Sequence, residues 1–554
     1  MYHKFPKTNK YYGKKPLFKV REISSIRHLF EGSCEMFADK CAFLVKDSHN
    51  TPYREITYKT FRENVYSFAG WLTERGVFDK KVAVIGENSY DWCVCYMAVQ
   101  CGNGIIVPID KELPFEDIKH IADFSEVSCV VASEKILKKH PQIADLCPLV
   151  ISMNEMQEIY RKPYEIPANI YPDPNAVSII IFTSGTTGKA KGVMLTQKNI
   201  AVDIMNALAL FEMTPEDRFL SVLPIHHTYE CTCSFLAPIY SGASIAFCEG
   251  LLHFASNIKE AQPTMFFVVP LIAEAVLRNI ETKVKKAGKE KLIKKAIAVS
   301  DFLKKFGVDI TGILFKEIKE ALGGKLRVMM VGAAAPRPET AKKLESLGII
   351  TVQGYGMTEC SPIIAANRVS CHNHCSAGLI PPEIDVKIVD ANEKGVGEIV
   401  VKGENVTCGY YKNEEATKEL LRDGWCYTGD LGYIENSFVF ITGRKKEVII
   451  TANGENVFPE EVETVLDDCE YIKESMVYAK EDKVLSALIV PDYDVFKEKF
   501  GEIPDDEKVE KIIGEKIKEF NKTFPPYKVI SKFIIRKEEL IRTTTRKIKR
   551  FANL

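Results

Sequence analysis

A segment rich in hydroxyls, glycines and lysines directly follows an apolar run in the first half of the chain. The segment is Thr183–Gly192, with the sequence TSGTTGKAKG, and the apolar run is Ala176–Ile181. Glycines let backbone N–H groups approach an anion, hydroxyls donate to its oxygens, and lysines supply positive charge. The spacing is not that of a Walker A loop, because Gly185 and Gly188 are too close together and Ala190 stands where Ser or Thr is required. The segment predicts a phosphate-binding loop of another kind, with a plain polar turn as the alternative.

A second candidate segment, Gln353–Glu359 with the sequence QGYGMTE, follows the strand-like run Gly348–Val352. Tyr355, flanked by glycines, can offer a flat face on which a base stacks. The Thr358 hydroxyl can reach a phosphate oxygen, and the Glu359 carboxylate can bind Mg²⁺. The glycine spacing is not G-x-G-x-x-G, so a dinucleotide-binding fold is not supported. The alternative interpretation is a tight turn without a ligand.

Two further motifs could bind a sugar. Trp425–Asp430 has the sequence WCYTGD, and Gly443–Glu447 has the sequence GRKKE. A carboxylate can accept hydrogen bonds from two ribose hydroxyls, and a nearby guanidinium can donate to the same sugar. Taken singly these motifs are typical of surface turns. In order with the first two segments they predict a nucleotide site in which Asp430 and Arg444 bind the ribose.

A fourth cluster, Cys371–Cys375 with the sequence CHNHC, is made of side chains that bind metals. Structural zinc sites usually space their ligand pairs more widely, and four ligands within so short a stretch can hardly close a tetrahedron. We therefore expect an exposed loop here rather than a metal site.

The elements that must position these residues follow an alternating pattern. Short β-rich runs alternate with longer helical patterns, which favours an α/β fold with largely parallel sheets. From about Pro381 the strand-like runs are shorter and are joined by Gly, Asn and Asp turns, which predicts a small barrel-like or antiparallel layer. The last segment of about a hundred residues is predicted to be a small α+β domain. The β-rich runs are Lys81–Gly86, Gly104–Ile109, Cys129–Ala132, Ala243–Cys248, Met265–Val269, Leu326–Val331, Val386–Val389, Gly397–Val401 and Phe438–Ile441.

The composition is that of a soluble globular protein, with 46% hydrophobic and 27% charged residues in a chain of 554. A formal net charge of -1 argues against a dedicated nucleic-acid binder. The N-terminal stretch has no apolar core of a signal peptide, so we expect the 16 cysteines to be reduced thiols in the cytosol. The apolar run Met265–Ile272 is interrupted by Pro270 and falls short of the ~18 residues of a membrane span, so no spanning segment is expected.

A lysine-rich insert differs in composition from its surroundings. Between Lys283 and Lys305, lysines far outnumber the acidic residues Glu290 and Asp301, and apolar residues recur at partly helical spacing. We expect a solvated amphipathic helix. The alternative is a patch that contacts anionic lipid where an apolar substrate is collected.

The four segments proposed for the nucleotide, together with LPIHHTYE, VGAAAP and the lysine motif RTTTRKIKR, resemble the signature set of the adenylate-forming (AMP-binding) superfamily in its usual order, and LPIHHTYE, the lysine-rich insert and ANGENVFPEEVE point to its long-chain branch. The resemblance extends from Thr183 to Arg550, and it is specific because the full ordered set is present. Within the superfamily the chain is most similar to the long-chain fatty-acyl-CoA synthetases. The additional motifs are LPIHHTYE at Leu223–Glu230, VGAAAP at Val331–Pro336, ANGENVFPEEVE at Ala452–Glu463 and RTTTRKIKR at Arg542–Arg550.

The resemblance implies a two-step reaction on a medium- or long-chain fatty acid. The carboxylate attacks the α-phosphate of ATP in the presence of Mg²⁺, which gives an acyl-adenylate and pyrophosphate. Coenzyme A then displaces AMP and forms the acyl-CoA thioester. Two alternatives stay open: a ligase that loads an acyl carrier protein, and a nucleotide-binding protein of the same fold without catalytic activity. The expected compartment is the cytoplasm, with peripheral membrane contact through the 283–305 insert as a further hypothesis.

Carried over by position, the resemblance implies catalytic roles for Lys547, Glu359, His227 and Thr358. Lys547 would place its charge between the carboxylate and the triphosphate during adenylation, the alternative being a merely basic tail. His227 would lie at the mouth of the acyl site, the alternative being a structural histidine. Mg²⁺ would be held by Glu359 with help from Thr183. The implied ATP-binding residues are Thr183, Ser184, Gly185, Thr186, Thr187, Gly188, Lys191, Ala333, Ala334, Ala335, Gly354, Tyr355, Gly356, Met357, Thr358, Asp430, Arg444 and Lys547.

The resemblance also implies a large domain of residues 1–445 and a small domain of residues 446–554, with a hinge at Lys446. Rotation about this hinge would let Lys547 serve adenylation and then leave to admit the thiol. The chain departs from the family pattern at Arg546, where glycine is usual. Glycine allows backbone angles that arginine adopts only at a cost, so we expect a different loop or a slower adenylation step. Apolar candidates for the acyl pocket are Phe235, Phe266, Val268, Leu271 and Ile363.

Overall fold

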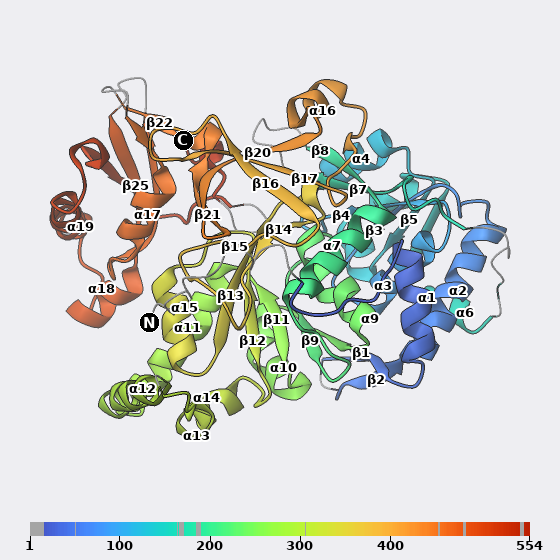
Figure 1. The fold of residues 1–554 in the computed structure, drawn as a ribbon, viewed down its shortest axis with the longest axis horizontal. Helices are drawn as coiled ribbons and strands as arrows, with labels where there is room; N and C mark the ends of the chain where they lie inside the picture. The colour runs from blue at the N-terminus through green and yellow to red at the C-terminus, as the bar shows by residue number, and fades with distance from the viewer. Residues whose placement is uncertain are drawn as a thin grey trace. The chain divides into compact units, whose positions relative to one another are not determined.

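The computed structural model describes residues 16–49, 51–162, 164, 171–183, 190–304, 306–451, 455–479, 484–542 and 548–554 (Figure 1). The chain divides into two compact units. Unit 1 consists of Met1–Val386, Val401–Cys426 and Asn436–Val439, and unit 2 consists of Lys387–Val400, Tyr427–Glu435 and Phe440–Leu554. The predicted α/β class, with a large N-terminal part and a smaller C-terminal part, is confirmed.

The first sheet of unit 1 has seven strands in the order β18-β8-β7-β4-β3-β5-β6. The pairs among β3 to β7 are parallel, whereas β8 pairs antiparallel with β7 and with β18. The core residues of β3 to β5 are buried, as expected for parallel strands covered on both faces. The strands are β3 (Lys81–Ile85), β4 (Ile105–Ile109), β5 (Cys129–Ala132), β6 (Leu149–Ser152), β7 (Val177–Thr183), β8 (Lys191–Thr196) and β18 (Gly409–Tyr410).

The helices of this half are interleaved with its strands along the chain. Helix α3 is apolar on almost all sides and is buried at every position except Asp91, because it packs against β3, β4 and α2. The helices are α1 (Ile26–Met36), α2 (Tyr58–Glu74), α3 (Tyr90–Gln100), α4 (Phe115–Ser125), α5 (Glu134–Lys139), α6 (Met156–Tyr160), α7 (Gln197–Leu210) and α16 (Glu414–Leu420).

The second sheet contributes strands to unit 1 in the order β15-β14-β13-β12-β11-β9-β10-β1-β2. The central pairs from β13 to β1 are parallel, and the outer pairs β13–β14, β14–β15 and β1–β2 are antiparallel. Strands β11 and β12 consist of apolar residues only, and Phe266 and Met329 belong to the core cluster beside the sheet. The strands are β1 (Cys41–Val45), β2 (Arg54–Thr57), β9 (Arg218–Ser221), β10 (Ser244–Phe247), β11 (Met265–Val268), β12 (Val328–Val331), β13 (Ile350–Gly356), β14 (Ile363–Ala366) and β15 (Gly378–Leu379).

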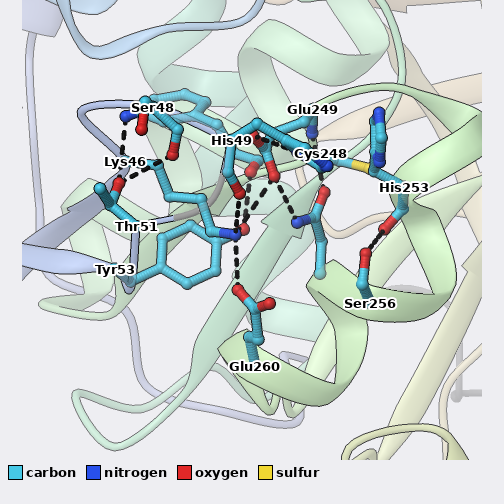
Figure 2. Close-up of polar contacts among 12 residues, drawn as sticks. Lys46, Ser48, His49, Thr51, Tyr53, Cys248, Glu249, His253, Ser256 and Glu260 are labelled. Atoms are coloured by element: carbon cyan, nitrogen blue, oxygen red, sulfur yellow. Dashed lines mark hydrogen bonds and ion pairs between the residues drawn. The ribbon is translucent and has the colours of Figure 1, made fainter.

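A group of paired charges lies beside the connection between β1 and β2 (Figure 2). The Lys46 ammonium lies 2.6 Å from a Glu260 carboxylate oxygen and 3.2 Å from one of Glu249. Tyr53 lies under the ammonium and donates its hydroxyl to the Phe247 carbonyl at 2.8 Å. Because Lys46 is shielded from solvent and matched by two carboxylates, this group has a structural role.

The predicted helix in the lysine-rich insert is confirmed. After α10 (Phe254–Ala261) and α11 (Pro270–Lys286), the insert forms α12 (Glu290–Lys304), and α13 (Thr311–Leu314) and α14 (Lys316–Ala321) lie beside it (Figure 1). Ile293 and Ile297 pack toward the core, while Leu292 and Phe302 are exposed. Contact of this surface with lipid stays a prediction. In the described part of the chain, every helix is too short or too polar to cross a membrane.

Unit 2 contains a three-stranded sheet in the order β24-β25-β26. The β24–β25 pair is antiparallel and the β25–β26 pair is parallel, and α17 and α19 pack on a core around Val462, Ile489 and Ile513. The strands are β24 (Ile472–Ala479), β25 (Leu485–Pro491) and β26 (Lys532–Ile535). The helices are α17 (Pro459–Asp467), α18 (Tyr493–Phe500), α19 (Asp506–Asn521) and α20 (Arg550–Asn553).

The remaining strands lie in residues 384–457, the stretch in which the chain passes between the two units. They are β16 (Ile384–Val389), β17 (Gly397–Gly403), β19 (Leu421–Arg422), β20 (Trp425–Glu435), β21 (Phe438–Arg444) and the short pair β22 (Ile449–Ile450) and β23 (Asn456–Val457). These short strands correspond to the layer expected after Pro381, and the predicted strands at 386–389, 397–401 and 438–441 are confirmed.

Candidate functional site

The ends of the predicted phosphate loop lie directly opposite each other at the end of a hairpin. Strand β7 ends at Thr183, β8 begins at Lys191, and these two residues are cross-strand partners. Residues 184–189, which include Ser184, Gly185, Thr186, Thr187 and Gly188, lie outside the described residues. The hydroxyl of Thr183 and the ammonium of Lys191 are therefore held by the ladder at the entrance to the loop.

The predicted Mg²⁺ ligand, Glu359, lies on a short 3₁₀ turn, Thr358–Cys360, that follows β13. Its side chain is buried, and one carboxylate oxygen accepts a hydrogen bond from the Tyr410 hydroxyl at 2.7 Å. The ring of Tyr410 lies under the Lys191 ammonium, with 5.0 Å between the nitrogen and the ring centroid. Tyr410 thus connects the phosphate-loop lysine to the carboxylate, although the two are far apart in the sequence.

The segment that carries Tyr410 is fixed to both neighbours by hydrogen bonds. The Thr407 hydroxyl donates to the Met194 carbonyl on β8 at 2.5 Å, and the Thr407 backbone N–H donates to the Glu359 carbonyl at 2.8 Å. Asn405 donates its side-chain amide to the carbonyl of Cys360 at 2.8 Å. Neither Thr407 nor Tyr410 stands in a motif that we used, so sequence analysis missed them.

The QGYG segment belongs to a strand, so the alternative interpretation of a tight turn does not hold. Strand β13 continues through Gly356, and Tyr355 pairs with Ala365 on β14. A Cβ atom on Gly356 would lie 1.8 Å from the Pro362 carbonyl oxygen, so glycine is needed there for a close backbone approach. Met357, the next residue, donates its N–H to the same carbonyl at 2.9 Å.

The other predicted half of the adenine slot, Ala333–Ala335, follows the adjacent strand β12. Strands β12 and β13 are parallel with Val331 opposite Gln353, so the alanine loop begins where β13 continues as Gly354–Gly356. Ala333 has a left-handed backbone with φ of 66°, and Ala334 and Ala335 are exposed. The two predicted segments are thus neighbours, and their role toward adenine stays a prediction.

The two histidines of LPIHHTYE occupy different environments. His226 is buried, with its Nε2 3.7 Å from a carboxylate oxygen of Asp110, and burial lowers its pKa to about 3, with a further effect of the Lys111 charge. His227 is half-buried and precedes the short helix α8 (Thr228–Glu230), and the two ring centroids are 4.1 Å apart. The placement fits the choice of His227 over His226 as the functional candidate, and its role stays a prediction.

Glu230, at the end of the same motif, is a fully buried carboxyl that we had not assigned a role. It accepts hydrogen bonds from the hydroxyls of Ser221 at 2.7 Å and Ser234 at 2.8 Å and from the Val222 N–H at 3.1 Å. Burial raises its pKa to about 8, although these hydrogen bonds favour the charged form. The helical segment that carries Ser234 is the π-helix Cys231–Leu236, followed by α9 (Ala237–Ser241).

Glu230→Gln should change how the stability of the protein depends on pH. The folded-state pKa of about 8 lies above the unfolded value of about 4.3, so between them only the folded state holds the proton. Glu230 therefore makes the wild type lose stability as pH rises through this window, and the variant lacks that loss. We expect the Tm of Glu230→Gln relative to wild type to rise between pH 5.5 and pH 8.5. The exposed variant Glu393→Gln is the control, and parallel Tm curves for all three proteins would contradict the prediction.

In unit 2 the predicted ribose pair is assembled on adjacent strands. Asp430 lies in β20 and is buried, and the Nε atom of Arg444, the last residue of β21, is 3.0 Å from its Oδ1. Gly429 has a φ of +72°, which places a kink at Gly429–Asp430 within β20. Glu398 stabilises the kink, because it accepts from the Gly429 N–H at 3.1 Å and pairs with Lys445 at 2.7 Å. Sequence analysis missed Glu398.

Lys547 lies outside the described residues, but both ends of its segment are held in unit 2. Arg542 pairs with Glu474 at 2.5 Å, and a β-bridge joins Arg542 to Ile548. Arg550 pairs with Glu463 at 2.7 Å and with Glu447 at 3.1 Å. Glu447 directly follows Lys446, which is exposed, so Arg550 connects the predicted hinge to the predicted lysine segment.

The chain matches two family models and is similar to known synthetases and ligases. A family model described as AMP-binding enzyme matches residues 30–411, and one described as AMP-binding enzyme C-terminal domain matches residues 446–553. A fatty acyl-CoA synthetase B of Dictyostelium discoideum is 27% identical to this chain, over 83% of this chain and 76% of the length of that protein. A chloroplastic long-chain-fatty-acid–acyl-carrier-protein ligase of Arabidopsis thaliana is 25% identical over 85% and 76%. A long-chain-fatty-acid–CoA ligase 5 of Rattus norvegicus is 28% identical over 80% and 72%.

Two solved structures share the fold. The o-succinylbenzoate CoA synthetase of Bacillus subtilis, in complex with its acyl-adenylate intermediate, superposes with a TM-score of 0.76 at 21% identity, over 94% of this chain and 97% of that one. ATP-bound MatB from Rhodopseudomonas palustris superposes with a TM-score of 0.75 at 22% identity, over 95% and 98%. The fold class is therefore confirmed independently of the sequence motifs.

Proposed function

The chain belongs to the AMP-binding enzyme family, and from this premise we propose that it is an ATP-dependent fatty acid–CoA ligase. In the first half-reaction a fatty-acid carboxylate oxygen bonds to the α-phosphorus of ATP, the bond to pyrophosphate breaks, and acyl-AMP forms. In the second, the sulfur of coenzyme A bonds to the acyl carbon, AMP leaves, and the thiol proton is released.

The observation that supports this proposal best is the Lys191–Tyr410–Glu359 arrangement. Attack of a carboxylate on a triphosphate brings two anions together, so the site must hold positive charge at both. Lys191 places an ammonium at the entrance of the phosphate loop, and Tyr410 orients the buried carboxylate of Glu359 beside it. The arrangement thus combines a cationic group for phosphate with an oriented anionic group for a metal ion.

The donor chemistry at this place fits Mg²⁺, which prefers hard oxygen ligands and keeps several waters. Glu359 would hold the ion with help from the Thr183 hydroxyl. Mg²⁺ would neutralise charge on the phosphates. The Thr358 hydroxyl would contact the α-phosphate, and residues 183–191 would hold the leaving pyrophosphate.

The remaining assignments follow the family pattern. Ala333–Ala335 and Tyr355 would line the adenine, Asp430 and Arg444 would bind the ribose, and His227 would lie at the mouth of the acyl site. Lys547 would neutralise charge during adenylation. Residues 446–554 would turn about Lys446 between the half-reactions, relative to residues 1–445.

The substrate class and the acceptor are drawn from the names of the relatives. All three relatives named above carry a fatty-acyl or fatty-acid substrate in their names, two with CoA and one with an acyl carrier protein. We therefore propose a medium- or long-chain fatty acid and coenzyme A, with the carrier protein as the second candidate acceptor. The cytoplasm is the proposed compartment, and α12 is the surface that would meet a membrane.

ATP–pyrophosphate exchange tests the proposal. We expect exchange that depends on a fatty acid and that peaks within a panel ordered by carbon number, because only the matched chain fills the acyl site. AMP release and thioester formation with free coenzyme A or with an acyl carrier protein then identify the acceptor. A chain that gives no exchange with any acid from short to very long would be a nucleotide-binding protein without ligase activity, and the proposal would be wrong.

A further inference from the structure

Three potential metal-ligand atoms converge in unit 1, on residues that are not among those assigned to ATP. Glu345 belongs to α15 (Pro338–Ser346), and His372 and His374 belong to the connection between β14 and β15. Oε2 of Glu345 is 3.1 Å from Nε2 of His372 and 2.7 Å from Nε2 of His374. The imidazole rings are nearly buried, with side-chain exposures of 8% and 13%. The expectation of an exposed loop at Cys371–Cys375 is therefore wrong for these two histidines.

Hydrogen-bond accounting at His372 points to a cation between these atoms. Nδ1 of His372 lies 3.1 Å from the carbonyl oxygen of Val369, and a carbonyl can only accept, so Nδ1 carries the proton. A neutral ring then presents its Nε2 lone pair to the carboxylate oxygen of Glu345. Two lone pairs at this distance repel, unless a proton or a metal ion lies between them. A His ring that donates one N–H to a backbone carbonyl and turns the other nitrogen to a metal is also the usual arrangement of metal ligands.

The loop that carries the histidines is held by hydrogen bonds within the protein. Asn367 accepts from the Asn373 N–H at 2.9 Å and donates to the carbonyls of Gln353 and Ser376 at 3.2 and 2.9 Å. Asn373 accepts from the Cys375 N–H at 2.9 Å. These bonds set the backbone on both sides of His374 and fix the loop to β13. The site would therefore lose little conformational entropy on binding.

We propose that Glu345, His372 and His374 bind a divalent transition-metal ion, with Zn²⁺ as the favoured species. Two imidazole nitrogens and one carboxylate oxygen form a common set of three protein ligands for zinc, with a water in the fourth position. Metal–ligand bonds of about 2.0–2.2 Å in a tetrahedron place ligand atoms about 3.3–3.6 Å apart. The three atoms here all lie within 4.8 Å of one another, and the 3.1 and 2.7 Å separations from Glu345 would lengthen when an ion takes the place of the proton between these atoms. Mg²⁺ disfavours nitrogen ligands, so this site would be distinct from the one proposed at Glu359.

The ion would join two elements that lead from the proposed nucleotide site. Helix α15 follows Val331–Pro336 along the chain, and the histidine loop follows β14, which pairs with β13 and its Tyr355. A metal bridge from Glu345 to the histidines would fix the helix against the loop. The expected consequence is a more stable unit 1, because an ion that binds only the folded state stabilises it by mass action.

Other polar clusters are poorer candidates for a metal site. Around His49, the Glu249 carboxylate is already matched by Lys46 and accepts from the side chain of Asn257 at 2.8 Å (Figure 2). Among the described residues, the Glu345 group is the one in which three ligand atoms of His, Cys, Asp or Glu residues meet.

The test measures metal content without ATP or fatty acid, so it is independent of the proposed ligase activity. The full-length chain without a histidine tag is stripped with chelator, incubated with Zn²⁺ in excess Mg²⁺, dialysed and analysed by elemental mass spectrometry. We expect wild type to keep one more equivalent of zinc than His374→Ala or Glu345→Gln, and to gain thermal stability with Zn²⁺ that neither variant gains. His120→Ala, at an exposed histidine, is the matched control and should behave as wild type.

The chain also has 16 cysteines, whose thiolates can bind zinc. The test therefore compares the zinc content of wild type with that of each variant and does not use the total zinc. Co²⁺ on the stripped wild type supplies a second measurement that needs no variant. We expect visible absorption of tetrahedral or five-coordinate cobalt without a thiolate charge-transfer band, abolished by one equivalent of Zn²⁺. Equal zinc in all four proteins, or no cobalt absorption in the wild type, would overturn the proposal and leave the cluster as a carboxylate paired with two histidines.

Discussion

Lys547→Ala should slow acyl-adenylate formation by about 10²–10³-fold, the range measured when one preorganised charge-stabilising donor is removed from an active site. The reason is the encounter of two anions: the fatty-acid carboxylate and the triphosphate repel each other until positive charge lies between them. Thioester formation from a supplied acyl-adenylate should change by no more than about threefold, because the thiol attacks after pyrophosphate and its charge have left.

The two half-reactions can be measured separately. ATP–pyrophosphate exchange reports adenylation, and coenzyme A consumption from synthetic acyl-AMP reports the second step. Lys549→Ala is the matched control, because Lys549 is exposed in the same segment and its backbone N–H to the Ile541 carbonyl is unaffected by the substitution. An equal loss in both half-reactions would contradict the proposed role of Lys547.

Ion pairs anchor both ends of the segment that contains Lys547. Arg542 pairs with Glu474, and Arg550 pairs with Glu463 and Glu447. The guanidinium of Arg550 is largely withdrawn from solvent, so breaking its pairs would leave charges unmatched at a cost of about 3–5 kcal/mol. These pairs therefore hold both ends of the segment, and the residue after the proposed hinge, within unit 2.

The sequence predicted the scaffold well, because parallel strands buried on both faces must be apolar throughout. Met265–Val268 and Val328–Val331 were recognisable for that reason, and both are central strands of the second sheet. For the QGYG segment, the alternative of a tight turn does not hold. Glycine usually marks a turn, but Gly356 is needed here by a strand that passes close to Pro362, a contact that no local pattern contains.

The parts of the site that were missed depend on long-range contacts. Tyr410 meets Lys191 and Glu359 only because β18 pairs with β8, and the local sequence around Tyr410 carries no such signal. The pocket candidates show the same limit. Phe266 and Val268 belong to the hydrophobic core of unit 1, whereas Leu271 is 46% exposed, and apolar type alone could not distinguish these environments.

The burial of the His372 and His374 rings could not be predicted from the local sequence pattern either. CHNHC suggested a surface loop because its ligands are too close together to close a tetrahedron by themselves. The third ligand atom comes from Glu345, on a helix that precedes the loop in the chain, and it reaches both rings. A search for metal ligands within one stretch of sequence could not find that partner.

Glu359→Gln should produce the second large loss, about 10²-fold in ATP–pyrophosphate exchange at low Mg²⁺, because it removes the negative charge that would hold the ion while keeping the shape of the side chain. The Tyr410 hydroxyl can still donate to the amide oxygen, so the local packing should remain. The loss should appear mainly as a higher Mg²⁺ concentration for half-maximal rate, and excess Mg²⁺ should restore part of the activity. Melting curves without ligand should match wild type within a few degrees.

Tyr410→Phe provides the contrast that separates charge from orientation. It removes the 2.7 Å hydrogen bond to Glu359 and keeps both the carboxylate and the aromatic ring under Lys191. We expect a loss of only about tenfold, consistent with one hydrogen bond to a charged group, with little change in the Mg²⁺ dependence. If Glu359→Gln left the Mg²⁺ dependence unchanged, or if Tyr410→Phe shifted it as strongly, then Glu359 would not be the ligand. Its carboxylate would then act only as the hydrogen-bond partner that joins β18 to the turn after β13.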